Sequence, residues 1–591
     1  MPTKKSSKNS GPQGHPVSNR AAVTRGAEKH SPLTLASTLT PAQLKQKLHH
    51  LIESQGLFHR HQETTFSNRG TVFNWVFDTR ALFMQQLAMD VITTLFWHHY
   101  RDKLPFQVGG MEVAAIPLVC AIQSKARELG IPLNAFLIRK ERKTYSRMRA
   151  IEGEITNEPI VLVDDAINSG GSFEKCRVSI NRDKPAGFTL AQVTHVFALI
   201  SFESRRATQW LATHNIQLHR VFTLPDFNVT EASDSPPFTT RYSIAWRAMV
   251  KGGWPFHVVP KSAPVVVEDK VFMGTDSGSI CAFNSTTGQP LWQHVITGAP
   301  ERKGIWSTPA VHQGKVYIGG YNGVLYCLNA EDGKVLWQQA ACEWIGSTPL
   351  IVPRHGMLYV GLEYARPRNP GSVAAFKLDT GERMWESWLR VIQHGSAAYY
   401  AGEDIVIFGT NEYTLSAYKP HNGQPVWQFS TRGAIKYAPA VDEIRGLVAA
   451  ASFDGNIYLV NAKTGALVAE FQTGNQLYTT PLFHGDRLYC GSTDRKLYII
   501  NLTTLTVEKT IDCGARIFAT PRFLAPNSIL IGTAGGRMME INATTLQTMG
   551  EVMVPDAITN AVASANNDQL IIIPTYLNEL YAYHRQPLPT P

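Results

Sequence analysis

The feature that most constrains the fold is a repeat of about 40 to 48 residues that runs from about residue 264 toward the C-terminus. Each copy contains short runs of alternating apolar and polar residues, bounded by Gly, Asp and Asn. Two copies show the pattern clearly: Lys270–Gly274 followed by Ser279–Asn284, and Lys315–Gly319 followed by Val324–Asn329. Short runs with a period of two predict strands, and a tandem array of such units predicts four-stranded antiparallel blades around a channel.

We count eight copies, of which the last is short of its final strand. Residues 242–248, which contain Trp246, could supply that strand from outside the array and so remove both exposed sheet edges. Tryptophan recurs near the end of several copies, and we interpret it as packing between neighbouring blades, not as a ligand site. The copies end at Trp292, Trp337, Trp385, Trp427, Phe471, Ile511, Val552 and Tyr583.

Residues 160–173 carry a second signal, which is not repeated. The apolar run 160–162 predicts a buried strand that ends at the acid pair Asp164 and Asp165, and a glycine-rich turn follows. Glycines allow several backbone N–H groups to converge on a phosphate at the start of a helix. Two carboxylates at the end of a strand can accept hydrogen bonds from a ribose 2′- and 3′-hydroxyl pair. The segment therefore predicts a ribose-phosphate site, and an ordinary strand-to-turn exit is the alternative. The turn residues are Asn168, Ser169, Gly170, Gly171 and Ser172.

Helical and strand patterns alternate between residues 41 and 230. The apolar spacing predicts helices over 41–56, 82–100 and 113–129, and strands over 133–138, 160–163, 192–200 and 218–223. This alternation predicts a parallel sheet with helices on both faces. At 591 residues the chain is too long for one core. We expect a disordered basic tail over 1–40, an α/β domain over 41–230 and an all-β eight-bladed propeller over 231–591.

Residues 139–149 are dense in cations, among them Arg139, Lys140 and Lys143. Like charges along a loop repel one another, so we expect this loop to be mobile until a polyanion neutralises it. Pyrophosphate is one such polyanion, and a solvated surface loop is the alternative interpretation.

Together these segments resemble the type I phosphoribosyltransferases, and the orotate phosphoribosyltransferases in particular. The acid pair and its turn resemble the motif that binds 5-phosphoribosyl-1-pyrophosphate (PRPP), and Arg139, Lys140 and Lys143 match the catalytic lid. Residues 77–80 (Phe-Asp-Thr-Arg) match a segment upstream. The resemblance covers residues 45–228 and implies a Rossmann-like type I phosphoribosyltransferase fold. The match to the pyrophosphate loop consists of Gly109, Gly110, Met111 and Glu112.

The resemblance implies transfer of phosphoribose from PRPP to an orotate-like nucleobase, with release of pyrophosphate. Asp164 and Asp165 would fix the ribose hydroxyls and act as catalytic residues with the cations of the lid, and residues 168–172 would hold the 5′-phosphate. Mg²⁺ would arrive with PRPP, without a dedicated set of protein ligands. A homodimer through this domain is also implied.

Two positions depart from the family. Tyr145 stands where the lid usually has His, and Ser204 stands where the family has an Arg that helps to hold orotate. Neither the activity nor the acceptor base therefore follows from the resemblance. The alternative is a regulatory or scaffold protein that binds PRPP or a nucleotide without turnover, for example in a stress or defence system.

The repeats resemble PQQ-like, tryptophan-docked propeller repeats, which occur in quinoprotein dehydrogenases and in outer-membrane assembly scaffolds. The enzymes of that group commonly carry adjacent cysteines and are exported. Here the cysteines of the repeats are scattered and the N-terminus lacks an apolar export signal. We therefore expect no PQQ and interpret the propeller as a platform for an unidentified protein partner.

Composition bears on the cellular compartment in which we expect the protein. None of the seven cysteines forms a Cys-x-x-Cys pair, which indicates a reducing compartment and neither a disulfide framework nor a zinc site. No run of 18 apolar residues is present, so we expect no membrane span and a cytoplasmic location. The net charge is +9, and the first 40 residues hold six basic residues against Glu28 alone. We interpret this tail as a solubilising leader, and it is the one place where we expect any nucleic-acid contact.

Overall fold

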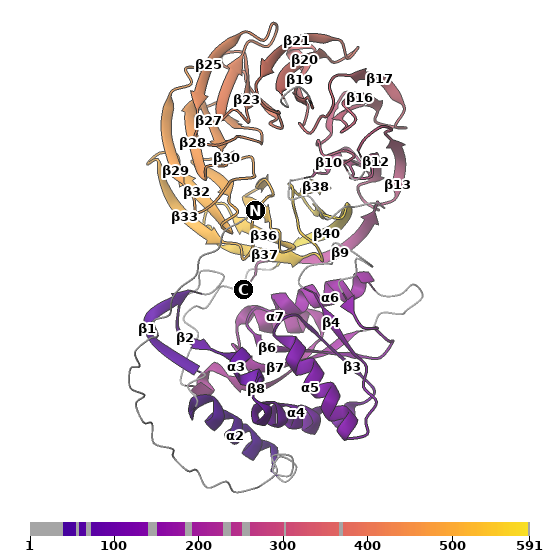
Figure 1. The fold of residues 1–591 in the computed structure, drawn as a ribbon, viewed down its shortest axis with the longest axis vertical. Coiled ribbons are helices and arrows are strands. Elements are labelled where there is room, and N and C mark those ends of the chain that lie inside the picture. The colour runs from indigo at the N-terminus through magenta and orange to yellow at the C-terminus, as the bar shows by residue number, and fades with distance from the viewer. Residues whose placement is uncertain are drawn as a thin grey trace, which may run out of the picture.

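The computed structural model describes residues 39–54, 58–66, 72–139, 151–183, 192–227, 238–250, 261–300, 303–365 and 370–588 (Figure 1). Its sheets form two groups. A six-stranded sheet and a two-stranded hairpin lie before residue 228, and eight four-stranded sheets lie after residue 239. Figure 1 shows the eight sheets as a ring above the N-terminal α/β domain. The predicted tail over 1–40 lies outside the described residues except for its last two.

The N-terminal domain alternates helices with strands, as the sequence predicts. One predicted helix, 82–100, is wrong as a single element, because the chain breaks at Met84 and Gln85 into two helices. A two-stranded antiparallel hairpin, which the sequence analysis did not predict, precedes them. The elements are α2 Pro41–Ser54, β1 Phe58–Phe66, β2 Val72–Phe77, α3 Thr79–Phe83, α4 Gln86–Tyr100, η1 Arg101–Lys103, β3 Gln107–Met111, α5 Ala115–Glu128, β4 Ala135–Ile138, β5 Ile151–Glu152, β6 Ile160–Ile167, α6 Gly171–Asp183, β7 Val193–Ser201, α7 Arg205–His214, β8 Gln217–Thr223 and η2 Leu224–Phe227.

The large sheet has the strand order β5-β4-β3-β6-β7-β8. Five strands are parallel, as predicted, and the short edge strand β5, which the sequence analysis did not predict, is antiparallel to β4. The chain moves from β3 to β4 in one direction and from β6 through β7 to β8 in the other. Because such crossovers are right-handed, α5 covers one face of the sheet, and α6 and α7 cover the other.

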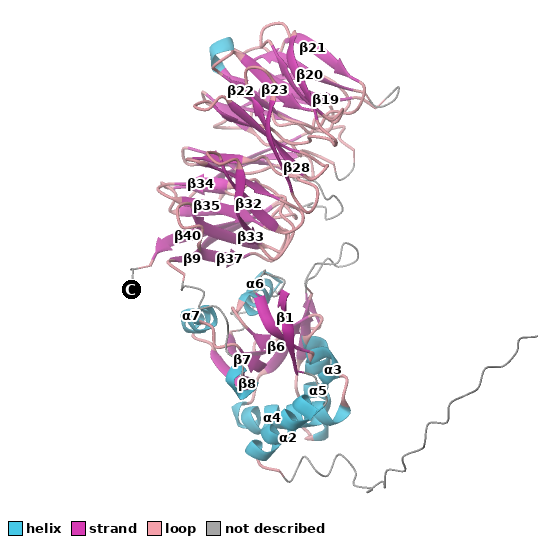
Figure 2. Ribbon diagram, turned by 90° about the vertical axis from the view of Figure 1, so that its left-hand side faces the viewer, coloured by secondary structure: helices cyan, strands magenta, loops and turns pink. Residues whose placement is uncertain are grey.

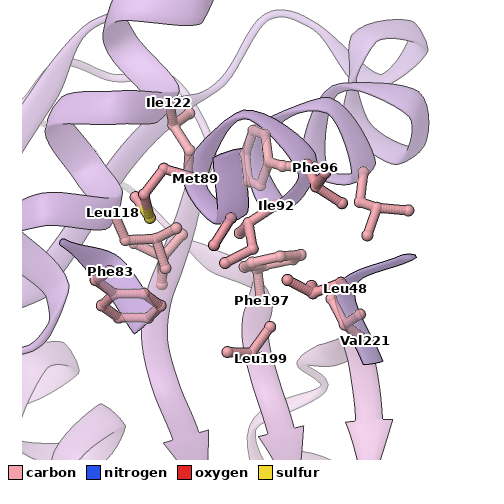
Figure 3. Packing of buried hydrophobic residues seen from close by; sticks show 14 of the residues in the cluster. Leu48, Phe83, Met89, Ile92, Phe96, Leu118, Ile122, Phe197, Leu199 and Val221 are labelled. Carbon is pink, nitrogen blue, oxygen red and sulfur yellow. The ribbon is translucent and has the colours of Figure 1, made fainter. Parts of the chain in front are cut away.

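Alternation along β6 explains the two cores of this domain. Val161 belongs to the core under α2, α4 and α5, whereas its neighbour Leu162 belongs to the core under α6 and α7. Successive side chains of a strand point to opposite faces, so one apolar run serves both cores. Figure 3 shows the first core, where Phe96 of α4 lies edge-on to Phe197 of β7 at 5.3 Å between ring centroids.

The remaining chain forms an eight-bladed propeller. Each blade is antiparallel, and in the first seven blades the strands lie side by side in chain order. The blades are β10 Val265–Val267, β11 Lys270–Gly274, β12 Ser279–Asn284 and β13 Pro290–Val295; β14 Ala310–His312, β15 Lys315–Gly319, β16 Val324–Asn329 and β17 Val335–Ala340; β18 Leu350–Val352, β19 Met357–Glu363, β20 Gly371–Lys377 and β21 Arg383–Leu389, with η3 Pro353–His355 between β18 and β19; β22 Ala397–Tyr400, β23 Ile405–Gly409, β24 Thr414–Tyr418 and β25 Pro425–Ser430; β26 Ala440–Asp442, β27 Leu447–Ala451, β28 Asn456–Asn461 and β29 Leu467–Gln472; β30 Leu482–His484, β31 Arg487–Gly491, β32 Lys496–Asn501 and β33 Thr506–Asp512; β34 Arg522–Leu524, β35 Ser528–Gly532, β36 Arg537–Asn542 and β37 Thr548–Met553; and β38 Ala563–Ala565, β39 Leu570–Pro574 and β40 Glu579–Pro587 with β9 Thr240–Met249.

The strand predicted to close the ring does so. β9 pairs antiparallel with β40, with Trp246 opposite Ala582, and completes the last blade. Tyr242 of the same strand donates a hydrogen bond from its hydroxyl to Glu540 of the preceding blade at 2.5 Å. The N-terminal segment of the propeller is thus held by both of the last two blades.

The tryptophans pack between blades, as predicted. The Trp246 Nε1–H donates to the carbonyl oxygen of Ser285 in the next blade at 3.0 Å. Its ring lies on Gly288, where a Cβ would come within 2.4 Å of the ring, so only glycine allows this approach. The same contact recurs between Trp292 and Gly333, Trp337 and Gly381, Trp385 and Gly423, and Trp427 and Gly465.

The two domains meet where α6 faces the outer strand of the seventh blade, a contact that Figures 1 and 2 both show. Arg182 of α6 forms a buried ion pair with Asp556 at 3.2 Å. Lys175 of α6 donates to the carbonyl oxygen of Gly535 at 3.2 Å. The propeller therefore packs on the α6 and α7 side of the sheet. No helix in the described ranges is both long and apolar enough to cross a membrane.

Candidate active site

The direction in which successive strands are added to the sheet reverses between β3 and β6, and open α/β sheets bind their ligands outside the carboxyl ends of the strands at such a point. Gly109 of β3 lies opposite Leu162 of β6 in parallel register. Met111 ends β3 two residues beyond Gly109, and Asp164 follows two residues beyond Leu162 in β6. The topology therefore brings the predicted pyrophosphate loop and the predicted acid pair together at one edge of the sheet.

Two glycines of β3 are required by the packing. A Cβ on Gly109 would lie 2.4 Å from the ring of Phe136, and a Cβ on Gly110 would lie 2.6 Å from the carbonyl oxygen of Val163. No side chain fits at these distances, so the strand carries glycine where it approaches β4 and β6. Beyond Met111 the chain turns at Glu112, and the peptide bond between Glu112 and Val113 is cis.

The acid pair is held by a residue from an earlier part of the chain. The hydroxyl of Thr79, at the start of α3, donates to Asp165 Oδ2 at 2.6 Å. The backbone N–H of Asp165 donates to Asp164 Oδ1 at 2.9 Å, and Asp78 caps α3 by accepting from the N–H of Ala81 at 2.9 Å. The upstream segment 77–80 thus contacts the acid pair through Thr79. The sequence showed that this segment matched the family, but not that Thr79 would fix an acid.

The glycine-rich turn leads directly into α6. Gly170 has a φ of +80°, and a Cβ there would lie 2.9 Å from the ring of Trp210 in α7. Its carbonyl oxygen accepts from the N–H of Glu174 at 2.9 Å, which starts the helix, and Ser172 is exposed in the first turn. The partial positive charge of a helix N-terminus favours a bound phosphate at this turn. Asn168, Ser169 and Gly171 are partly exposed beside it.

Of the predicted lid cations, the structure places Arg139. Its Nε–H donates to Glu152 of β5 at 2.7 Å, and its guanidinium lies 3.9 Å from the carboxylate of Glu112. Arg139 therefore stands at the same sheet edge as the acid pair, and its charge is partly neutralised there. Lys140, Lys143 and Tyr145 lie outside the described residues.

Ser204 has a structural role. It caps α7, accepting from the N–H of Ala207 at 3.2 Å, and its hydroxyl donates to the carbonyl oxygen of Asn168 in the predicted phosphate turn. The two arginines that follow diverge: Arg205 is exposed, and the guanidinium of Arg206 lies 4.6 Å from the ring centroid of Phe238. Neither observation places a base-holding arginine at the acid pair.

One group in the described part of the chain has donor atoms arranged for a metal ion, and it lies in the propeller. His355, Asp404 and His421 place their donor atoms within 4.8 Å of one another. His355 Nε2 already hydrogen-bonds to Asp404 Oδ1 at 2.6 Å, as does the hydroxyl of Tyr399 at 2.7 Å. His355, Tyr399 and Asp404 thus form a hydrogen-bonded cluster, which lies far along the chain from the acid pair.

Comparison with known proteins finds similarities for both domains. The family described as outer membrane protein assembly factor BamB matches residues 240–367, 302–511 and 369–586, and the chain belongs to this family. The N-terminal domain is phosphoribosyltransferase-like. The chain is similar to the orotate phosphoribosyltransferase of Bradyrhizobium sp. strain ORS 278, with 29% identity over 160 residues, which are 26% of this chain and 82% of the relative.

Two further sequence relatives of the N-terminal domain are orotate phosphoribosyltransferases as well. The orotate phosphoribosyltransferase of Rhodopseudomonas palustris strain TIE-1 is 25% identical over 175 residues, 29% of this chain and 89% of the relative. That of Tropheryma whipplei strain Twist is 39% identical over 66 residues, 11% of this chain and 31% of the relative. Among solved structures, BamB from Moraxella catarrhalis matches 58% of this chain and 98% of its own length, at 17% identity and a TM-score of 0.46.

Proposed function

We propose that the N-terminal domain binds PRPP and transfers its phosphoribose to a nucleobase-like acceptor with release of pyrophosphate. The observation that supports this most is the placement of Asp164 and Asp165 between the glycines of β3 and the turn into α6, at the switch point of the sheet. A sugar diphosphate has groups for all three: hydroxyls for the acids, a 5′-phosphate for the turn and a pyrophosphate for the loop after β3. Two relatives that are similar in sequence to this domain are orotate phosphoribosyltransferases.

Each part has a physical role in the proposed reaction. Displacement at the ribose carbon passes through a state in which positive charge grows on the sugar, and two carboxylates beside it oppose that charge. The turn at residues 168–172 holds the 5′-phosphate and so fixes the sugar relative to the acceptor. Arg139, with Lys140 and Lys143, neutralises the departing pyrophosphate. For this, Arg139 exchanges its present carboxylate partners, Glu112 and Glu152, for the anion.

The donors at this edge fit magnesium, because carboxylate oxygens are the hard ligands that this ion prefers. When bound with PRPP, the ion supplies positive charge to the pyrophosphate oxygens. Asp164 and Asp165 are the protein residues that would reach it. Thr79 orients Asp165 by donating a hydrogen bond to one carboxylate oxygen, Oδ2. The other oxygen, Oδ1, takes no part in this bond.

A second candidate function rests on Ser204. A serine carries no positive charge for an acidic base such as orotate, and the hydroxyl of this one is already engaged in capping α7 and in binding the turn at Asn168. This favours either an acceptor other than orotate, or binding of PRPP or a nucleotide without turnover in a regulatory or scaffold protein. In both cases the propeller would serve as the platform for a protein partner, and the N-terminal domain would pair with a second copy.

The experiment is to mix the full chain with PRPP, Mg²⁺ and each of a panel of nucleobases and to follow pyrophosphate. Transfer predicts release that depends on one base and disappears in the Asp164→Asn/Asp165→Asn variant. Binding without turnover predicts PRPP affinity in the wild type with no release for any base. Release that is equal in the two proteins would exclude the acid pair from the reaction.

A further inference from the structure

A cavity of about 440 Å³ lies between the two domains. Its floor is formed by α6 and α7 of the N-terminal domain, and its roof by β9, β37 and β40 of the last two blades. Figure 2 shows these helices directly below those strands. Small-molecule sites commonly have this size and occur preferentially at domain interfaces.

This cavity is distinct from the edge that carries the acid pair. The described residues at the carboxyl ends of β3 and β4, and both Asp164 and Asp165, are absent from its lining. Ser169 and Gly171 line one end of it, so it touches the phosphate turn from the side of α7. A ligand here would lie behind the proposed PRPP site, not in it.

Aromatic side chains give the cavity flat apolar walls. The ring of Trp210 comes from the floor, and those of Tyr242 and Tyr583 come from the roof. The Tyr242 hydroxyl is engaged by Glu540 at 2.5 Å and that of Tyr583 donates to the carbonyl oxygen of Met553 at 3.5 Å. The hydroxyls are thus held by the protein, and the rings of Trp210 and Tyr242, which are partly exposed, offer surfaces for stacking against a planar group, whereas that of Tyr583 is buried.

The charge of the lining favours an anion. Each of its two acids has a guanidinium partner: Glu174 accepts two hydrogen bonds from Arg177, and Glu551 pairs with Arg537. Arg241 of β9 also lines the cavity, and among the described residues it has no carboxylate within ion-pair distance. Guanidinium groups bind phosphate through paired hydrogen bonds, so a phosphate is the anion that this position suits.

From these walls and this charge we infer that the interdomain cavity binds a nucleoside 5′-monophosphate, with the base between the aromatic rings and the phosphate on Arg241. A base supplies the planar group and a single phosphate supplies the anion, within one molecule of suitable size. The inference does not depend on the transfer activity proposed above.

A ligand in this cavity would contact the phosphate turn through Trp210. The ring of Trp210 packs on Gly170, and its Nε1–H donates to Glu174 in the first turn of α6 at 2.9 Å. Glu174 is the residue whose N–H bonds to Gly170. Trp210 therefore links the cavity to the turn of the proposed PRPP site, whose residues Ser169 and Gly171 also line the cavity, and occupancy of one site would alter the affinity of the other reciprocally.

The test is calorimetric titration of AMP, GMP, CMP and UMP, each alone, into the full chain carrying Asp164→Asn and Asp165→Asn. These two substitutions are meant to prevent a nucleotide from binding, as a reaction product, at the proposed PRPP site. We expect one molecule bound per chain for at least one nucleotide. Adding Arg241→Ala should weaken it about tenfold, the loss expected for a charge-assisted bond to phosphate. Ser243→Trp, which fills the cavity from β9, should abolish it.

Arg390→Ala, at an exposed arginine of the third blade, is the matched control and should leave the affinity unchanged. The inference is overturned if none of the four nucleotides gives heat at millimolar concentration. It is equally overturned if binding occurs only with the acid pair intact and is insensitive to Arg241→Ala, because the nucleotide would then occupy the sugar site. Absence of pyrophosphate release would count against the proposed function alone.

Discussion

At the scale of single residues, the candidate site depends on positions where the structure requires one particular residue type for a definite physical reason. Gly170 combines a left-handed backbone with a ring directly above its Cα, and Thr79 bridges two segments separated by 86 positions. The first was predictable, because a phosphate turn needs glycine. The second was not, since no local pattern indicates which distant hydroxyl will reach an acid.

Gly170→Ala should destabilise the protein more than Gly130→Ala. Both positions have a positive φ, but a Cβ at Gly130 meets open space, whereas one at Gly170 lies 2.9 Å from the Trp210 ring. Both variants place an alanine at a positive φ, but only Gly170→Ala also packs a Cβ against the Trp210 ring. We expect a further loss of about 1–3 kcal/mol in the free energy of unfolding for Gly170→Ala, measured by chemical denaturation. Equal losses in the two variants would show that Trp210 moves away freely.

Thr79→Val should weaken PRPP binding about ten- to a hundredfold. The valine keeps the shape of threonine but removes the hydrogen bond that orients Asp165, and such bonds to charged groups contribute about 1.5–3 kcal/mol. Thr94→Val is the control, because that hydroxyl also donates to an oxygen, the carbonyl of Asp90 at 2.6 Å, but in α4. Calorimetry with PRPP should separate the two variants. An unchanged affinity in Thr79→Val would remove Thr79 from the site.

At the scale of elements, the blades were predictable and the N-terminal helices less so. A blade is built from strands that are neighbours in sequence, so alternation and turn residues such as Gly288 report it directly. The break between α3 and α4 has no comparable signal, since the exposed Met84 continues the apolar pattern. The edge strand β5 is two residues long, too short for a period to be read.

Trp385→Phe should lower the stability of the propeller by about 1–3 kcal/mol. The Trp385 Nε1–H donates to the carbonyl oxygen of Pro420 at 2.6 Å, and the ring covers Gly423 in the next blade. Trp388, three residues later on the same strand, is 60% exposed, and its replacement by Phe should change stability by less than about 0.5 kcal/mol. The midpoint of thermal unfolding measures both. Similar shifts for the two variants would contradict a docking role.

At the scale of the whole molecule, the contact between the domains is the feature that no sequence pattern indicated. Arg182 and Asp556 are separated by 374 positions, and each belongs to an element whose own fold does not require the other. The interdomain cavity follows from this docking and was therefore also beyond prediction. By contrast, the order of the two folds and the closing strand β9 followed from repeats and motifs.

Breaking the buried pair should loosen the contact between the domains. Arg182 is nearly inaccessible, so Arg182→Met leaves Asp556 without a partner that it has in the native protein, at a cost of about 3–5 kcal/mol. The double variant Arg182→Met/Asp556→Ala should lose less than the sum of the two single variants. Scanning calorimetry should show the domains unfolding at more widely separated temperatures in Arg182→Met. Strictly additive losses would mean that the two residues do not interact in solution.

The central claim is that an activated sugar diphosphate binds where the acid pair meets the turn into α6. Titration of PRPP with Mg²⁺ into the full chain tests it most directly. We predict one site per chain in the wild type, and at least about tenfold weaker binding in Asp164→Asn/Asp165→Asn, because each lost carboxylate removes charge-assisted hydrogen bonds to the ribose. The absence of heat at millimolar PRPP, or equal affinity in the two proteins, would contradict the claim.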